Sequence, residues 1–250
     1  MDSLYWKQLT PNIDIKYTTK LFYKKYLYRL ELTAYGGASI NTPLDINTSL
    51  AFRHKCYREI NYGGSWRAKM RNQLKQADPA WLTYLQQFKR SVNFDCNIRI
   101  EEPKLQIYTN LDSELEEFVR KLPKEFNQYV SGISIPKNDQ ELALLQAGKK
   151  IVKKNPKYPF KLIFRDGNYD IQNKNNILNY LDSLGDIVRI PEHCRSQLSK
   201  PYTSIWECYV YTKDLGLITF LQIIDPKLIR SIIEMATIED INNDIIQGEP

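Results

Sequence analysis

The sequence predicts an α+β protein in which mixed or antiparallel sheets are covered by helices. Three observations support this fold class. Residues 26–35 alternate between apolar and polar side chains, as a half-buried strand does. Residues 65–76 repeat apolar side chains every four positions, as an amphipathic helix does. Beyond residue 92, strand-like and helix-like segments alternate and are mixed with a hairpin, which is typical of α+β folds.

The strand expected at 26–35 is the first element along the chain. Its inward face carries apolar and aromatic side chains, namely Tyr26, Tyr28, Leu30, Leu32 and Ala34. Gly36-Gly37 ends the strand, because adjacent glycines favour a turn. Residues 36–50 are small and polar and include proline, so they predict a loop.

Two helices are expected next, on either side of Asp78-Pro79. The first spans 65–76 and begins at Ser65, a favourable N-cap residue. It carries an apolar stripe (Trp66, Met70, Leu74) beside a basic stripe (Arg67, Arg71, Lys75). The second spans 79–90, with proline at its first helical position. A DNA-binding helix-turn-helix is an alternative interpretation, but the turn lacks glycine and the basic stripe lies on the first helix.

The remaining chain predicts a hairpin followed by alternating elements. The hairpin spans 97–109 and turns at Glu102-Pro103, with Ile98, Ile100, Leu105 and Ile107 inward. The later expected elements are helix 112–122, strand 130–135, helix 138–153, strand 159–165, helix 174–184, strand 187–190, strand 204–212 and helices 215–224 and 226–236. A ferredoxin-like arrangement is the specific expectation for the C-terminal 150 residues.

Domain boundaries are drawn from composition. Residues 1–91 form a basic region, 92–236 an α+β domain and 237–250 an acidic amphipathic tail. Packing of all three as one compact unit is the alternative. Tyr-Thr at 108–109 and at 211–212 ends two strands that each lead into an apolar-faced helix. This similarity fits either two related βα units or chance.

Composition predicts a globular protein in the cytoplasm. Hydrophobic residues make up 42% and charged residues 26% of the chain. No apolar run approaches the roughly 18 residues of a membrane span, and the first residues lack the pattern of a signal peptide. The four cysteines are sparse, which fits free thiols in a reducing compartment. The composition favours residues with AT-rich codons, a bias common in phages, viruses and low-GC bacteria. If the protein is viral, the expected compartment is the host cytoplasm.

Positive charge is concentrated near the N-terminus. Residues 1–91 hold 15 Lys/Arg and 6 Asp/Glu, a net of +9, whereas residues 92–250 hold 20 and 23, a net of −3. Two basic clusters, at 16–29 and 53–75, account for most of this excess. A third basic run at 149–161 interrupts the acidic half. Such asymmetry indicates a polyanionic partner, because phosphates bind clustered cations with release of counterions.

Nucleic acid is the favoured partner, with cations on phosphates and rings stacked on bases. The candidate contacts are Lys24, Lys25, Arg29, Arg53, Lys55, Arg58, Arg67, Lys69, Arg71 and Lys75, with Tyr23, Tyr62 and Trp66 as the rings. For the cluster at 16–29 alone, an ordinary strand with a solvated basic face explains the tyrosines equally well. The sequence does not distinguish DNA from RNA, or a single strand from a double strand.

Catalytic, metal and cofactor motifs are not found in the sequence. His54 and Cys56, and likewise His193 and Cys194, lack a second pair at zinc-site spacing. The favoured function is therefore a non-enzymatic nucleic-acid-binding protein, an accessory to replication, transcription or packaging in a phage or virus. One alternative is an assembly protein whose basic half binds an acidic protein. The other is a metal-dependent nuclease, for which Asp95, Glu102 and Lys104 offer the right residue types.

Overall fold

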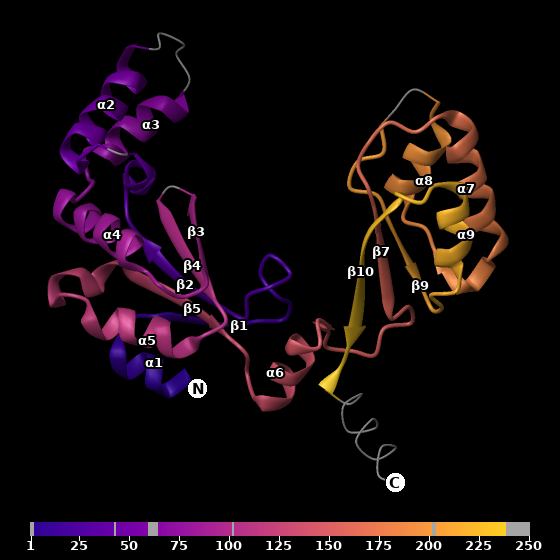
Figure 1. Cartoon of the computed structure of the whole chain (residues 1–250), viewed down its shortest axis with the longest axis horizontal. Coiled ribbons are helices and arrows are strands. Elements are labelled where there is room, and N and C mark those ends of the chain that lie inside the picture. The colour runs from indigo at the N-terminus through magenta and orange to yellow at the C-terminus, as the bar shows by residue number, and fades with distance from the viewer. Residues whose placement is uncertain (1–2, 43, 60–64, 102, 202–203, 239–250) are drawn as a thin grey trace. The chain divides into compact units, whose positions relative to one another are not determined.

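A computed structural model describes residues 3–42, 44–59, 65–101, 103–201 and 204–238. The chain is an α+β protein, as the sequence predicts, and it contains two five-stranded mixed sheets (Figure 1). Each sheet belongs to its own compact unit. Unit 1 comprises Met1–Thr18 and Phe22–Lys137, and unit 2 comprises Thr19–Leu21 and Asn138–Pro250. The basic region 1–91 lies almost entirely in unit 1, where its strands pair with strands from 96–135.

The sheet of unit 1 has the strand order β1-β5-β2-β4-β3. Its strands are β1 (Asp14–Tyr17), β2 (Tyr28–Thr33), β3 (Cys96–Glu101), β4 (Lys104–Thr109) and β5 (Val130–Ile135). β1 pairs with β5 in parallel and the other neighbours are antiparallel. The predicted hairpin at 97–109 is confirmed as β3 and β4. The predicted strand at 26–35 is confirmed as β2, which is central and therefore more buried than a half-buried strand.

The described part of unit 1 contains seven helical segments. They are α1 (Ser3–Leu9), η1 (Gly37–Asn41), α2 (Ile46–Glu59), α3 (Ser65–Leu74), α4 (Pro79–Ser91), α5 (Asp112–Lys121) and η2 (Lys124–Tyr129). Of these, α2 packs on α3, on η1 and on α4. The predicted loop at 36–50 is wrong in part, because η1 and the start of α2 occupy it. α4 begins where expected, since the Asp78 carboxylate accepts hydrogen bonds from the first backbone amides of the helix.

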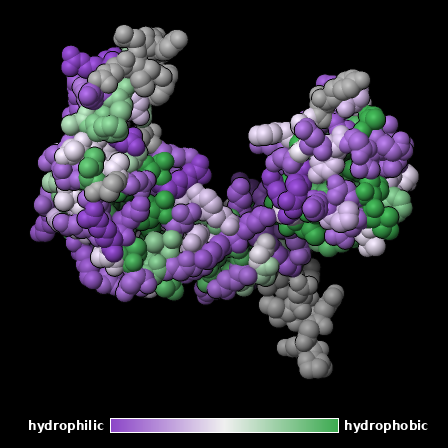
Figure 2. All heavy atoms as spheres, turned by 45° about the horizontal axis from the view of Figure 1, so that its top comes forward, coloured by the Kyte–Doolittle hydropathy of each residue, from purple (hydrophilic) through white to green (hydrophobic). Residues whose placement is uncertain are grey.

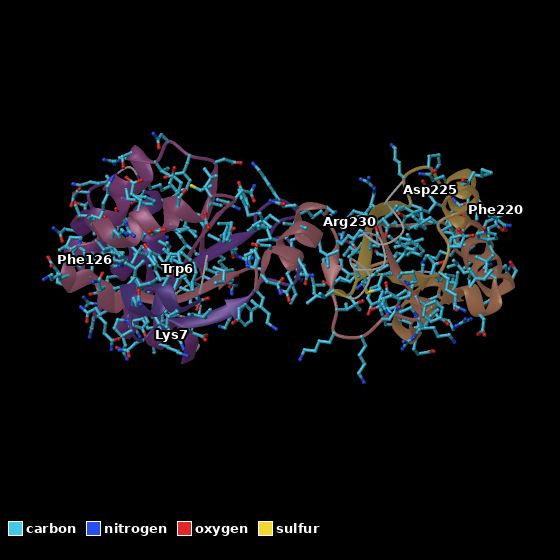
Figure 3. All side chains as sticks on the ribbon, turned by 90° about the horizontal axis from the view of Figure 1, so that it is seen from below. Trp6, Lys7, Phe126, Phe220, Asp225 and Arg230 are labelled. Atoms are coloured by element: carbon cyan, nitrogen blue, oxygen red, sulfur yellow. The ribbon has the colours of Figure 1, made fainter. Side chains whose placement is uncertain are left out.

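The core of unit 1 lies between β2, β4 and the helices α4 and α5. Leu30 and Ile107 are fully buried from the sheet, and Trp81, Leu82 and Leu115 are buried from the helices. Four of these side chains are aliphatic and one is indole, so burial removes a large apolar area from water. In α1, Trp6 is likewise buried while the adjacent Lys7 is exposed (Figure 3).

The sheet of unit 2 has the strand order β6-β10-β7-β9-β8. Its strands are β6 (Lys150–Ile151), β7 (Phe160–Phe164), β8 (Val188–Arg189), β9 (Tyr209–Thr212) and β10 (Ile229–Ala236). β6 pairs with β10 in parallel, and the other neighbours are antiparallel. The helices are α6 (Asp139–Gln146), α7 (Ile171–Ser183), η3 (Gly185–Ile187), α8 (Glu192–Ser199) and α9 (Leu217–Ile224).

Two predicted helices of unit 2 need correction. The helix expected at 226–236 is wrong, because this segment forms strand β10 between β6 and β7. The helix expected at 138–153 ends at Gln146, and Gly148 follows with a φ of 77°, a left-handed turn that glycine adopts easily. The predicted tail at 237–250 lies outside the described residues from 239 onward.

A second core fills the space between one face of this sheet and helices α7, α8 and α9. Leu162, Phe164 and Val210 contribute from the strands, and Ile177 and Leu221 from the helices. The four cysteines are free, and Cys194 and Cys208 lie in this core. Throughout the described ranges, no helix combines the length and the hydrophobicity needed to cross a membrane. The face shown in Figure 2 is mostly hydrophilic, with its apolar side chains in separate patches.

Candidate nucleic-acid interface

The basic segment 16–29 makes internal contacts in unit 1. Lys25 forms an ion pair with Asp95, with 2.6 Å between Nζ and Oδ2. The hydroxyl of Tyr26 donates to the same carboxylate at 3.2 Å. These hydrogen bonds, chiefly that from Lys25, lower the pKa of Asp95. The charge of Lys25 is therefore already balanced within the fold.

Arg29 is also engaged, on the sheet face opposite the helices. Its Nη2 donates to Ser134 Oγ at 3.0 Å, and its guanidinium lies 5.0 Å from the centroid of the Phe22 ring. Its buried Nε has no hydrogen-bond partner among the described residues. Contacts with Ser134 and Phe22 thus hold this side chain along the sheet.

Tyr23 and Lys24 form the tip of a tight turn between Phe22 and Tyr26. Both have positive φ angles, 52° and 59°, which are uncommon for residues other than glycine. Tyr23 is 49% exposed, and its ring meets the Tyr108 ring edge-on at 4.9 Å. Lys24 is exposed and forms no ion pair within the described part of the chain. Both residues are exposed enough to meet a ligand, as are Tyr17 and Lys20 of the same segment.

The second basic segment forms a different kind of surface. Helices α2 and α3 pack against each other and enclose a groove of about 410 Å³, which we call the α2–α3 groove. Its described lining residues are His54, Arg58, Ala68, Arg71, Asn72 and Lys75. The helical repeat explains this lining, because residues three or four positions apart share one face of a helix. None of these lining residues is acidic.

The other predicted contacts of this segment lie around the groove or outside the description. Lys55 and Lys69 are exposed on α2 and α3. Arg53 is half-buried, and its buried Nε has no hydrogen-bond partner among the residues described. Tyr62 lies outside the described residues, as do the side chains of Trp66 and Arg67. The structure thus brings Arg58, Arg71 and Lys75 together at one groove.

The third basic run, residues 149–161 of unit 2, also contains both a lysine with an acidic partner and a lysine without one among the described residues. Lys149 forms an ion pair with Glu234, with 3.0 Å between Nζ and Oε1. Lys161 instead lies over the Tyr209 ring, with Nζ 3.4 Å from the ring centroid. The sequence did not predict a binding role for the residues around Lys161, namely Tyr209, Tyr211 and Arg189. Alternation in the segment Tyr209–Thr212 signals a strand, but only the pairing with β7 shows which residues share a face with Lys161.

Asp95 and Lys104, two of the three residues considered for nuclease chemistry, have structural partners. Asp95 binds Lys25, and Lys104 donates to Glu31 at 2.8 Å. Burial opposes ionisation of Glu31, yet hydrogen bonds from Lys104 and Gln106 outweigh it and lower the pKa of this carboxyl. Glu102 lies outside the described residues. In the ranges that are described, no group of three or more His, Cys, Asp or Glu side chains could hold a metal ion.

A further cavity of about 390 Å³ lies between α4 and α5 of unit 1. Aromatic side chains, including Tyr84, Phe88 and Phe118, form much of its lining. Glu114 and Glu117 line it as well. These carboxylates would repel a phosphate, so this cavity does not suit a polyanion.

Comparison with protein families, with curated proteins and with solved structures finds no match to this chain. The assignment of function therefore depends on the surfaces described above.

Proposed function

We propose that this chain is a non-enzymatic nucleic-acid-binding protein that contacts phosphates through the α2–α3 groove. The observation that carries this proposal is the convergence of Arg58, Arg71 and Lys75 on a groove with no acidic residue among its described lining. Each cation that neutralises a phosphate releases a condensed counterion, which favours binding at low salt. Asn72 and His54 add hydrogen-bonding groups for phosphate or base edges.

The contrast with segment 16–29 supports the choice of this groove. Lys25 is neutralised by Asp95, and Arg29 is held on the sheet. A phosphate would have to compete with these internal partners, whereas it meets no described carboxylate in the groove. We therefore assign a secondary part to Tyr23 and Lys24, at the turn between Phe22 and Tyr26, and the main part to the groove.

The biological role that we propose is an accessory factor in replication, transcription or packaging in a phage or virus. It rests on the codon-biased composition together with the basic groove. The finer fold that we propose for unit 2 is ferredoxin-like. In its support, β7, α7, β8, β9, α9 and β10 follow one another, and their strands lie in the antiparallel order β10-β7-β9-β8. α8 is then an insertion, and β6 an added edge strand.

The groove is tested by charge removal with a matched control. Arg71→Gln/Lys75→Gln removes two cations from the groove, and Lys7→Gln/Lys124→Gln removes two exposed cations elsewhere in unit 1. Binding of a labelled 20-base-pair duplex and of a labelled single strand is followed by fluorescence anisotropy at salt concentrations from about 50 to about 300 mM. Counterion release is measurable over roughly this range. The groove variant should lower the slope of log K against log salt by about 2, and the control by far less.

Two results contradict the proposal. Equal losses in the two variants show a general charge effect, and wild-type binding that does not depend on salt shows that phosphate contacts are not made. Binding of a glutamate-rich protein in preference to either oligonucleotide favours the assembly-protein alternative. Magnesium-dependent cleavage of the probe favours the nuclease alternative, and its loss in Glu102→Ala would place that activity at the β3–β4 turn.

A further inference from the structure

Among the described residues, helices cover one face of β7, β9 and β10 in the sheet of unit 2 and not the other, while α6 contacts the edge strand β6. α7, α8 and α9 lie together on the same side of β7, β9 and β10 (Figure 1). Side chains alternate between the two faces along a strand. Leu162 and Val210 are directly paired, are fully buried, and face the helices. Lys161 and Tyr211, the adjacent pair, therefore belong to the opposite face.

The pairing of the strands fixes which residues share this open face. Lys161 is flanked by Tyr211 of β9 and Ile233 of β10, and Tyr211 is flanked in turn by Arg189 of β8. The next row contains Tyr209 beside Ile163. Lys150 lies beside Met235 at the β6 edge of the same surface. We call this surface the Lys161–Tyr211 face.

Cations on this face contact aromatic rings. Lys161 Nζ lies 3.4 Å from the ring centroid of Tyr209 and 5.7 Å from that of Tyr211. The Arg189 guanidinium lies 6.0 Å from the Tyr211 ring. The two tyrosine rings meet edge-on, with centroids 5.4 Å apart. Such cation–π contacts are weak relative to a charge pair with phosphate and can be exchanged for one.

The lysines of this face have no carboxylate partner among the described residues. Burial lowers the pKa of Lys161, and repulsion from Lys150 and Lys20 lowers it further. Within the described ranges, none of these three lysines forms an ion pair. Lys149, the neighbour of Lys150, is the lysine that pairs with Glu234. An anion placed on this face would relieve the repulsion among three cations.

We propose that the Lys161–Tyr211 face binds single-stranded nucleic acid, with bases stacked on Tyr209 and Tyr211 and phosphates held by the surrounding cations. The ammonium of Lys161 occupies the ring face of Tyr209, so a stacking base would displace it toward a phosphate. Flat sheet surfaces that carry aromatic rings suit unpaired bases, which a duplex keeps inside its own stack. An acidic peptide would balance the lysines but would leave the rings unused.

This inference extends the proposed function, since both assign a polynucleotide to the chain, but it shares no residue with the α2–α3 groove. It is tested on the full chain with labelled dT12 and rU12 and with a 12-base-pair duplex, by fluorescence anisotropy. Tyr211→Leu removes a ring from the open face, and Tyr211→Phe keeps it. Tyr180→Leu removes a half-buried ring from α7, on the covered side, where Tyr180 stacks on Phe220.

Tyr211→Leu should weaken binding of dT12 or rU12 at least about fivefold, because stacking on one aromatic ring contributes that much or more. Tyr211→Phe should stay within about twofold of wild type, since the ring is retained. Tyr180→Leu should bind as wild type does. A preference for dT12 or for rU12 identifies the natural strand. Crosslinking of a bromouracil-containing strand, mapped by mass spectrometry to residues 209–212, supports the site without any variant.

The two proposals can fail separately. If Arg71→Gln/Lys75→Gln binds every probe as wild type does while Tyr211→Leu loses the single strands, the groove is wrong and the open face stands. If Tyr211→Leu binds dT12 and rU12 as wild type does, the open face is wrong. Equal affinity for duplex and single strand in wild type, or displacement of dT12 by polyglutamate with no effect of Tyr211→Leu, also overturns it.

Discussion

In each unit, the sheet face opposite the buried core carries cations and tyrosines, but the described cations on the two faces have different partners. In unit 1, Lys104 pairs with Glu31, and Arg99 pairs with Glu101 on the same face. In unit 2, Lys161 lies on tyrosine rings and is repelled by Lys150 and Lys20. Both faces combine cations with tyrosines, so composition alone does not separate them.

The two faces thus differ in how their cations are paired and not in which residue types they carry. Glu31 is fixed between β4 and β5 by the register of the sheet, so its partners are always within reach. No described carboxylate occupies the corresponding position beside Lys161, where Ile233 lies instead. A phosphate gains most where the fold has left its cations without a partner.

Ile233→Glu tests this comparison most directly, by giving unit 2 the arrangement of unit 1. Ile233 is the β10 neighbour of Lys161, so a glutamate there should draw Lys161 off the rings into an ion pair. The new carboxylate would also repel phosphate. We expect the affinity for dT12 to fall at least about tenfold, as measured by fluorescence anisotropy.

Ile233→Gln is the matched control, since glutamine has the shape of glutamate without its charge. It should retain affinity within about twofold if charge is the cause. An equal loss in both variants would show that the apolar contact of Ile233, and not the free cation, maintains the face.

Glu31→Gln is expected to give the next largest effect, on the stability of unit 1. It leaves Lys104 without its carboxylate and weakens the hydrogen bond from Gln106, so the free energy of unfolding should fall by about 1 to 2 kcal/mol. Glu101→Gln on the same face should change little, because its side chain is 51% exposed. Urea unfolding, read by hydrogen exchange in β2, measures both, and a similar loss in the two variants would contradict the prediction.

The same carboxylate predicts a pH dependence. The pKa of Glu31 is lowered from its ordinary value of 4.5, so the unfolded chain takes up this proton more readily than the folded one. Its contribution to stability is then complete above pH 4.5 and is lost as the pH falls through the lowered pKa. The difference in unfolding free energy between wild type and Glu31→Gln should therefore shrink at acid pH. A difference that stays constant from neutral pH down to pH 3, roughly a unit below an ordinary glutamate pKa, would show that the pair does not depend on ionisation.

Local signals in the sequence predicted correctly those elements whose boundary residues and apolar periodicity indicate the same type of structure. Asp78-Pro79 marks the start of α4, and the hairpin at 97–109 has a turn between two alternating segments. β10 was mistaken for a helix because Asp225-Pro226 resembles the helix start at Asp78-Pro79. A bulge between Ile229 and Ser231 also shifts the alternation, so that Ile229 and Ile232, three positions apart, share one face of the strand.

The candidate site was predictable in part for a related reason. Helical spacing places Arg71 and Lys75 on one face, and the groove confirms that they lie together. Pairing across the sheet is not visible in the same way: Lys25 finds Asp95 70 positions away, and Lys161 finds Tyr209 on another strand. Charge counts include every lysine, whereas binding depends on those that the tertiary structure leaves unpaired.

Asp95→Asn should give the smallest effect, since it frees an exposed cation on unit 1. Lys25 and Asp95 have side chains that are 53% and 58% exposed, so water and salt screen their attraction and stability should not change measurably. The freed Lys25 should raise affinity for a duplex by less than about threefold at low salt. Asp186→Asn, the same charge change at an exposed position in unit 2, is the control. If the affinity rises only in Asp95→Asn, segment 16–29 contributes little to binding because an internal partner neutralises its charge. If the affinity rises equally in both variants, the effect reflects net charge alone.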